Sequence, residues 1–136
     1  MITIEQYFGD KPHLPEHEAN AALLLRSVDA LCAEAALAGV DVSHIDPDTG
    51  TCISGSKGGS GDGGFRLPTA TTGSGSSSHK EARGVDKYDP HNALDNWITD
   101  EILSRHGLYR EHPDHTHGWC HLTTRPPHSG KRTFLP

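Results

Sequence analysis

The chain has 136 residues, of which 33% are hydrophobic, and a formal net charge of −6 at pH 7. This length suffices for one modest hydrophobic core and not for a second, so we expect a single domain over residues 1–136. The sequence has no block of lysine and arginine, which disfavours nucleic acid as a partner, and no apolar run approaches the roughly 20 residues of a membrane-spanning helix, which disfavours membrane insertion.

The N-terminal third of the chain predicts one long helix. The first residues lack the basic, then apolar, order of a secretory signal, so we expect synthesis in the cytoplasm without a signal peptide. Apolar residues recur near helical spacing over residues 16–38, and Gly39 ends the pattern as a C-cap. Residues 40–53 contain β-prone pieces around an Asp-Pro-Asp-Thr-Gly turn, which suggests a hairpin.

The remainder predicts short strands and a second helix. Residues 55–64 consist almost entirely of glycine and serine, so we expect a mobile surface loop there. Residues 83–88 predict a strand, and a helix over about residues 91–105 follows Pro90. Two further strands are expected, at residues 119–124 and at the edge over residues 132–135. This order indicates an α+β fold in which a small antiparallel sheet packs against the two helices.

The cysteine and histidine contents indicate which kind of site the chain contains. The three cysteines, Cys32, Cys52 and Cys120, are odd in number and widely spaced, which indicates free thiols rather than a disulfide framework or a Cys-x-x-Cys zinc site. The eleven histidines are unusual for a short chain. Histidine is the commonest metal ligand, so this excess favours a metal site.

One histidine and one aspartate stand at a spacing suited to a shared metal. Residues 77–86 read Ser-Ser-His-Lys-Glu-Ala-Arg-Gly-Val-Asp, so that His79 leads out of a serine- and glycine-rich stretch and Asp86 lies on a predicted strand. A loop ligand and a strand ligand at this distance can converge on one ion. Catalytic zinc uses three protein ligands and keeps a fourth position for water, so we expect one Zn²⁺ and a third ligand from elsewhere.

The same segment resembles a signature of the D-alanyl-D-alanine carboxypeptidase and peptidoglycan endopeptidase family of zinc peptidases, which includes many phage endolysins. Ser77, His79 and Asp86 match its Ser-x-His-x-x-Gly-x-Ala-x-Asp pattern. Ala82 and Gly84 exchange the two small residues of that pattern and leave the ligand spacing intact.

Two further segments resemble the family in the same order along the chain. Gly64-Phe65-Arg66 is similar to the segment that precedes the signature, and Trp119-Cys120-His121-Leu122 is similar to the family's late Trp-x-His strand. The resemblance covers roughly residues 53–124, with the first helix as the expected packing partner.

The resemblance implies a role for each matched residue. The implied zinc ligands are His79, Asp86 and His121. Arg66 is expected to bind a substrate carboxylate or polarise a substrate carbonyl, since its planar fork pairs with a carboxylate through two hydrogen bonds. Ser77 is expected to support the site by hydrogen bonding. Apart from the resemblance, Trp119 is most simply a core residue or part of the pocket wall, and we name it as a candidate substrate-binding residue.

The general base is not assigned by the resemblance. The family places Glu or Asp three residues before the last ligand, or His two before it, and Gly118 and Trp119 stand there in this chain. The residues just upstream offer four acid or base candidates, which are Glu111, Asp114, His115 and His117. Of these we favour Asp114 and His117 as the catalytic pair.

A competing third ligand lies in the same region. Alternate residues of a strand face the same way, so His115 and His117 could together reach a metal. Pro113 and Gly118 make that segment look like a loop, whereas residues 119–124 look like a strand. This difference favours His121 over His117.

These observations predict a small zinc metallopeptidase that hydrolyses peptidoglycan peptide bonds, either as a D-Ala-type carboxypeptidase or as an endopeptidase. A phage or prophage lysis or tail enzyme fits the size, with a holin or a tail component giving access to the cell wall or periplasm. The alternative is a non-catalytic zinc-binding phage structural or cell-wall-recognition protein on the same fold, which the missing base favours. A zinc-free small phage protein is a third possibility.

Overall fold

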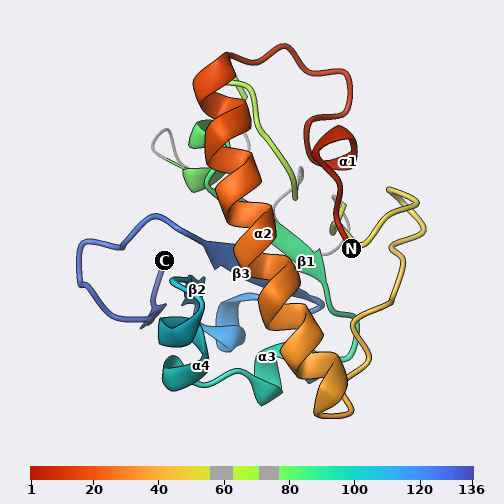
Figure 1. The fold of residues 1–136 in the computed structure, drawn as a ribbon, viewed down its shortest axis with the longest axis vertical. Helices are drawn as coiled ribbons and strands as arrows, with labels where there is room; N and C mark the ends of the chain where they lie inside the picture. Colours follow the sequence, from red (N-terminus) through yellow and green to blue (C-terminus); the bar gives the residue numbers. More distant parts are fainter. Residues whose placement is uncertain (56–62, 71–76) are drawn as a thin grey trace.

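The structure is a computed structural model that describes residues 1–55, 63–70 and 77–136. As predicted, the fold is α+β: the long helix α2 lies across one face of a small sheet (Figure 1). The elements are α1 (Ile4–Phe8), α2 (Pro15–Leu37), the 3-10 helix η2 (Ser78–Glu81), β1 (Gly84–Tyr88), α3 (Ala93–Trp97), α4 (Asp100–Arg105), β2 (Tyr109–Glu111), the 3-10 helix η3 (Pro113–His115), β3 (Trp119–Thr123) and β4 (Thr133–Phe134).

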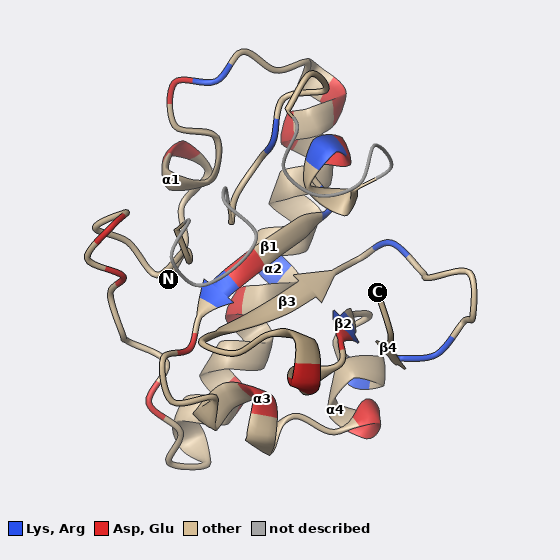
Figure 2. Ribbon diagram, turned by 180° about the vertical axis from the view of Figure 1, so that it is seen from behind, with Lys and Arg blue, Asp and Glu red and all other residues tan. Residues whose placement is uncertain are grey.

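The sheet has four strands in the order β1-β3-β2-β4. β3 pairs with β1 and β2 in antiparallel fashion, as expected, but β4 pairs with β2 in parallel, so the sheet is mixed rather than purely antiparallel. The segment between β3 and β4 forms a wide loop at the side of the sheet (Figure 2). This loop carries the chain back far enough for β4 to run in the direction of β2.

Helix α2 packs on one face of the sheet and supplies more buried core residues than any other element of the described chain. Its bounds agree with the prediction to within one residue, and Pro15 occupies the first helical turn, where its missing N–H costs nothing. Its buried residues lie one, three or four positions apart, the pattern of a single helical stripe: Ala21, Leu24, Leu25, Val28, Leu31 and Ala35. Val85, Cys120 and Leu122 of the sheet belong to the same hydrophobic cluster.

The predicted helix over residues 91–105 is two short helices instead. After α3 the backbone of Ile98 is extended, with φ −64° and ψ 135°. Thr99 then caps α4, because its hydroxyl accepts a hydrogen bond from the backbone N–H of Ile102. The new N-cap interrupts a helix that the spacing of apolar residues alone would have continued.

Several short elements differ from the predictions. α1 and β2 were not predicted, and the expected hairpin over residues 40–53 is reduced to a bridge between Asp46 and Thr51. Most of the glycine- and serine-rich loop predicted at residues 55–64 lies outside the described residues. Among the helices of the described residues, none is long and apolar enough to cross a membrane.

Candidate metal centre

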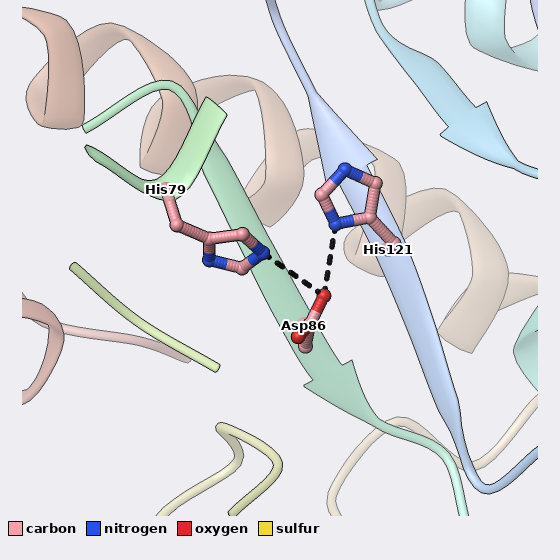
Figure 3. Close-up of side chains that lie close together, drawn as sticks. All are labelled: His79, Asp86 and His121. Atoms are coloured by element: carbon pink, nitrogen blue, oxygen red, sulfur yellow. Dashed lines mark hydrogen bonds and ion pairs between the residues drawn. The ribbon is translucent and has the colours of Figure 1, made fainter. Parts of the chain in front are cut away.

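His79, Asp86 and His121 form a buried group on the face of the sheet opposite α2. Their exposed fractions are 3%, 2% and 8%, and one ligand atom of each lies within 4.8 Å of the others. Oδ1 of Asp86 lies between the two rings, 3.3 Å from Nε2 of His79 and 2.9 Å from Nδ1 of His121 (Figure 3). The two histidines and the aspartate of the sequence prediction are therefore brought together.

Strand pairing explains why two of the three residues meet. Asp86 of β1 and His121 of β3 are direct partners in the antiparallel register. Directly opposite residues project from the same face with Cβ atoms about 5 Å apart. A slip of one residue in either strand would turn one of the two side chains into the core.

The 3-10 helix η2 brings His79 to the same place. Ser77 caps this helix, since its hydroxyl accepts a hydrogen bond from the backbone N–H of His79 at 3.3 Å. Ala82 ends the helix in the left-handed conformation with φ 58°, at the position where the zinc-peptidase signature has glycine. The turn then enters β1, so that seven residues suffice to bring His79 over Asp86.

Hydrogen bonds with the backbone of residues 63–66 hold His79 and Asp86 in place. Nδ1 of His79 lies 2.9 Å from the carbonyl oxygen of Gly64 and must donate to it, which leaves the lone pair of Nε2 directed at Asp86. The backbone N–H of Asp86 donates to the carbonyl of Gly63 at 2.8 Å, and that of Arg66 donates to the carbonyl of His79 at 3.2 Å. This outer support fixes the ring of His79 in the orientation needed for ligation through Nε2.

The electrostatics of the group favour the forms that bind metals. Burial lowers the pKa of His79, although the Asp86 carboxylate opposes this, so the ring is neutral at pH 7. Burial alone would raise the pKa of Asp86, but its interactions with His79 and His121 outweigh this and hold the pKa well below its usual range. A neutral imidazole beside an ionised carboxylate is the ligand form of both residues.

A pocket of about 630 Å³ opens onto the group. The pocket combines cationic, acidic and apolar side chains. Its lining consists of Arg66, Ser77, Ser78, His79, Asp86, Glu111, Trp119, His121, Thr123, Arg125, Pro127, His128, Ser129, Phe134, Leu135 and Pro136. Because all three ligand candidates belong to this lining, an ion held by them would face the pocket.

The predicted substrate-binding residues lie in the same lining. Arg66 is 2% exposed, with one guanidinium nitrogen 3.6 Å from Oδ2 of Asp86 and another donating to the hydroxyl of Ser77 at 3.4 Å. Trp119 lies on the same face of β3 as His121. Its buried Nε1 has no hydrogen-bond acceptor within the part of the chain that the structure describes.

The structure does not bring Asp114 and His117, the favoured catalytic pair, to the pocket. Both side chains are exposed, in the segment that contains η3, and neither belongs to the lining. Glu111, another of the four candidates, does line the pocket and is only half-buried. Burial raises the pKa of Glu111, Asp86 acts in the same direction, and His121 opposes them.

The donor set fits a divalent metal ion. Two imidazole nitrogens and one carboxylate oxygen are ligands that zinc accepts, and tetrahedral bonds of about 2.0–2.1 Å imply ligand atoms about 3.3 Å apart. Oδ1 of Asp86 lies 3.3 Å from Nε2 of His79 and 2.9 Å from Nδ1 of His121, close to this spacing, and the ligand atoms of all three residues lie within 4.8 Å of one another. The group could therefore bind a metal ion. Compared with protein-family models, with curated proteins and with solved structures, the chain matches none.

Proposed function

We propose that this chain is a zinc-dependent peptidase that hydrolyses peptide bonds of peptidoglycan. The observation that carries the proposal is the buried group His79, Asp86 and His121, which opens onto a pocket large enough for part of a peptide. Three protein ligands with an open side are typical of catalytic zinc, whereas structural zinc is closed by a fourth ligand. The three motif resemblances support the same class of reaction.

The residues around the group suit the binding of a scissile peptide bond. A bound zinc ion would polarise the substrate carbonyl and make a water molecule acidic enough to ionise near neutral pH. Arg66 lines the pocket beside Asp86 and can donate hydrogen bonds to a substrate carboxylate or carbonyl.

The pocket lining also suggests the class of substrate. Arg66 and Arg125 place positive charge in the pocket, while Trp119 and Phe134 add apolar surface. A short peptide with a free carboxylate and small side chains, such as a stem peptide that ends in D-alanine, fits this combination. Such a substrate would place the chain at the cell wall as a phage lysis or tail enzyme, with a partner such as a holin giving access.

A non-catalytic zinc-binding protein is the second candidate. Gly118 and Trp119 occupy the positions where the resembled family has its base, and Asp114 and His117 lie outside the pocket. A protein of this kind would bind zinc and the cell wall and release no product.

Turnover of defined substrates distinguishes the two candidates. Zinc-loaded protein is incubated with purified peptidoglycan and with a synthetic stem peptide ending in D-alanyl-D-alanine, and products are identified by mass spectrometry. The peptidase proposal predicts released D-alanine or peptide fragments, loss of release after treatment with a chelator, and recovery with added zinc. Zinc-loaded protein that binds the wall but releases nothing from either substrate would contradict it.

A further inference from the structure

A row of four side chains crosses the sheet at the level of the metal group. Asp86 is the register partner of His121, and Glu111 is the register partner of Phe134. The pairing of β2 with β3, continued by one residue, sets Glu111 opposite His121. Opposite residues on neighbouring strands project from the same face, and all four of these side chains line the pocket.

Glu111 stands beside the metal ligands and is not one of them. Neighbouring strands are about 4.8 Å apart, so Glu111 is one strand from His121 and two strands from Asp86. Its carboxylate does not belong to the group whose ligand atoms lie within 4.8 Å of one another. A carboxylate one strand away from His121 does not occupy the open side of a bound ion. It can still accept a hydrogen bond from a water molecule on that side.

Glu111 is a carboxylate of the pocket lining that is not among the metal-ligand candidates. Within the described residues, the acidic side chains of the lining are Asp86 and Glu111. Asp114 is 83% exposed and pairs with His112, and His128, which also lines the pocket, is an exposed loop residue. Placement therefore favours Glu111 for proton transfer over the residues favoured by the sequence.

Contacts on the other face of β2 keep Glu111 directed at the pocket. Its neighbour Arg110 projects to the opposite side, where its guanidinium donates to the backbone oxygen of Asp95 at 2.5 Å and to the hydroxyl of Thr133 at 3.0 Å. The strand itself is held by the backbone N–H of His112, which donates to the carbonyl of Phe134 at 2.8 Å. Glu111 is thus carried by a short strand that is fixed on both sides.

We propose that Glu111 is the catalytic proton-transfer residue of the peptidase reaction, an inference that rests on the proposed function. As the water oxygen bonds to the carbonyl carbon, the Glu111 carboxylate accepts one proton of that water. It then donates this proton to the amide nitrogen as the carbon–nitrogen bond breaks. The products are a carboxylic acid, which keeps the second proton of the water until it ionises, and a free amine.

The test compares Glu111→Gln with wild type, and with Glu16→Gln as a matched control at an exposed glutamate outside the pocket. Zinc affinity is measured by competition with a chelating dye, and hydrolysis of the synthetic stem peptide is measured on zinc-loaded protein. We expect the zinc affinity of Glu111→Gln to stay within about threefold of that of wild type, because Glu111 is not one of the ligands. The loss of a group that orients a metal ligand would instead lower the affinity tenfold or more. We expect its kcat to fall by roughly 10²- to 10⁴-fold, the usual contribution of a general acid or base.

Three results would overturn the role of Glu111. If wild type is active and Glu111→Gln is equally active, the role alone is wrong, and the proposed function stands. A loss of zinc affinity in Glu111→Gln comparable with the loss in His121→Ala would make Glu111 a fourth ligand. A wild-type protein that binds zinc and hydrolyses neither substrate would overturn the proposed function together with the role.

Discussion

At the scale of single residues, the candidate metal centre depends on contacts that orient each ligand. His79 is held by the carbonyl of Gly64, and Asp86 and His121 are held by their pairing across two strands. Asp86 also lies beside Arg66, so its carboxylate is surrounded by groups that stabilise its charge. These contacts assemble the ligands before an ion arrives, which reduces the ordering that binding would otherwise require.

Replacing His121 by alanine tests the third ligand. The His121→Ala variant is expected to bind zinc more than roughly 100-fold more weakly than wild type. The loss of a group that only orients a ligand costs up to that factor, and here a direct ligand is removed. Competition with a chelating dye measures this change. His91→Ala, at an exposed histidine, is the control and should bind zinc as wild type does. If His117→Ala loses the affinity and His121→Ala keeps it, the ligand assignment is wrong.

Gly84 allows η2 to pack closely against β1 and His121. A methyl group there would overlap Oγ of Ser78 and lie 3.2 Å from Cε1 of His121. Gly84→Ala is therefore expected to lower the free energy of unfolding by about 1–3 kcal/mol, the usual cost of overpacking, and to weaken zinc binding. Urea denaturation measures the first effect and dye competition the second.

The double variant Ser78→Gly, Gly84→Ala provides the control for this clash. Because the first substitution removes the side chain that the new methyl group would meet, the double variant should lose less stability than the sum of the two single variants. Strict additivity would show that the steric explanation is wrong.

At the scale of elements, long and regular pieces could be predicted from the sequence and short ones could not. The bounds of α2, β1 and β3 were predicted from the sequence pattern to within one or two residues. The meeting of Asp86 and His121 was implied by the family resemblance, and the pairing of β1 with β3 brings it about. β2 has only three residues and its identity depends on pairing with β3 and β4. Without that pairing, no local pattern distinguishes Glu111 from the exposed residues that follow it.

The position of β2 depends on a buried polar cluster behind it. Asp95 of α3 is fully buried at 1% exposure, accepts a hydrogen bond from the hydroxyl of Thr116 at 2.8 Å and pairs with Arg110 at 3.4 Å. This cluster joins α3, β2 and the segment before β3. It uses polar residues that a sequence pattern assigns to the surface.

Removal of the Asp95 carboxylate should therefore destabilise the fold. Asp95→Ala is expected to cost about 3 kcal/mol in the free energy of unfolding, since it leaves the buried guanidinium of Arg110 without its partner charge. Asp114→Ala, at a side chain that is 83% exposed, should change the same quantity by less than about 0.5 kcal/mol. Equal urea midpoints for the two variants would show that the cluster does not hold the sheet.

At the scale of the whole molecule, the two faces of the sheet have different roles. α2 lies across one face, where the core packs (Figure 1). The side chains of the metal group project from the other face, where the pocket opens. The loop and strand after β3 complete the pocket wall with Arg125 and Phe134, residues that no sequence pattern distinguishes. Because the ligand candidates are buried, both the stability of the fold and its affinity for a metal ion should depend on pH.

The stability of the metal-free protein should fall as the pH drops below about 6.5. Burial lowers the folded-state pKa of His79 below 6.5, its value in the unfolded chain, so below that pH the unfolded state binds a proton that the folded state does not. The contribution is complete above pH 6.5 and decreases on acidification by up to about 1.4 kcal/mol per pH unit.

Urea denaturation between pH 5 and pH 8 measures this dependence. In His79→Asn the side-chain amide can still donate to Gly64 but does not titrate, so the slope below pH 6.5 should be shallower than in wild type by up to that amount. Equal slopes in the two proteins would mean that His79 is not buried in its neutral form.

The proposed function requires that one zinc ion is held by His79, Asp86 and His121 at the pocket. Diffraction from crystals of the zinc-loaded protein, measured on both sides of the zinc absorption edge, tests it most directly. We expect one anomalous peak about 2.0–2.2 Å from Nε2 of His79, a carboxylate oxygen of Asp86 and Nδ1 of His121. The absence of a peak at this position, or a peak at His115 and His117 instead, would contradict it.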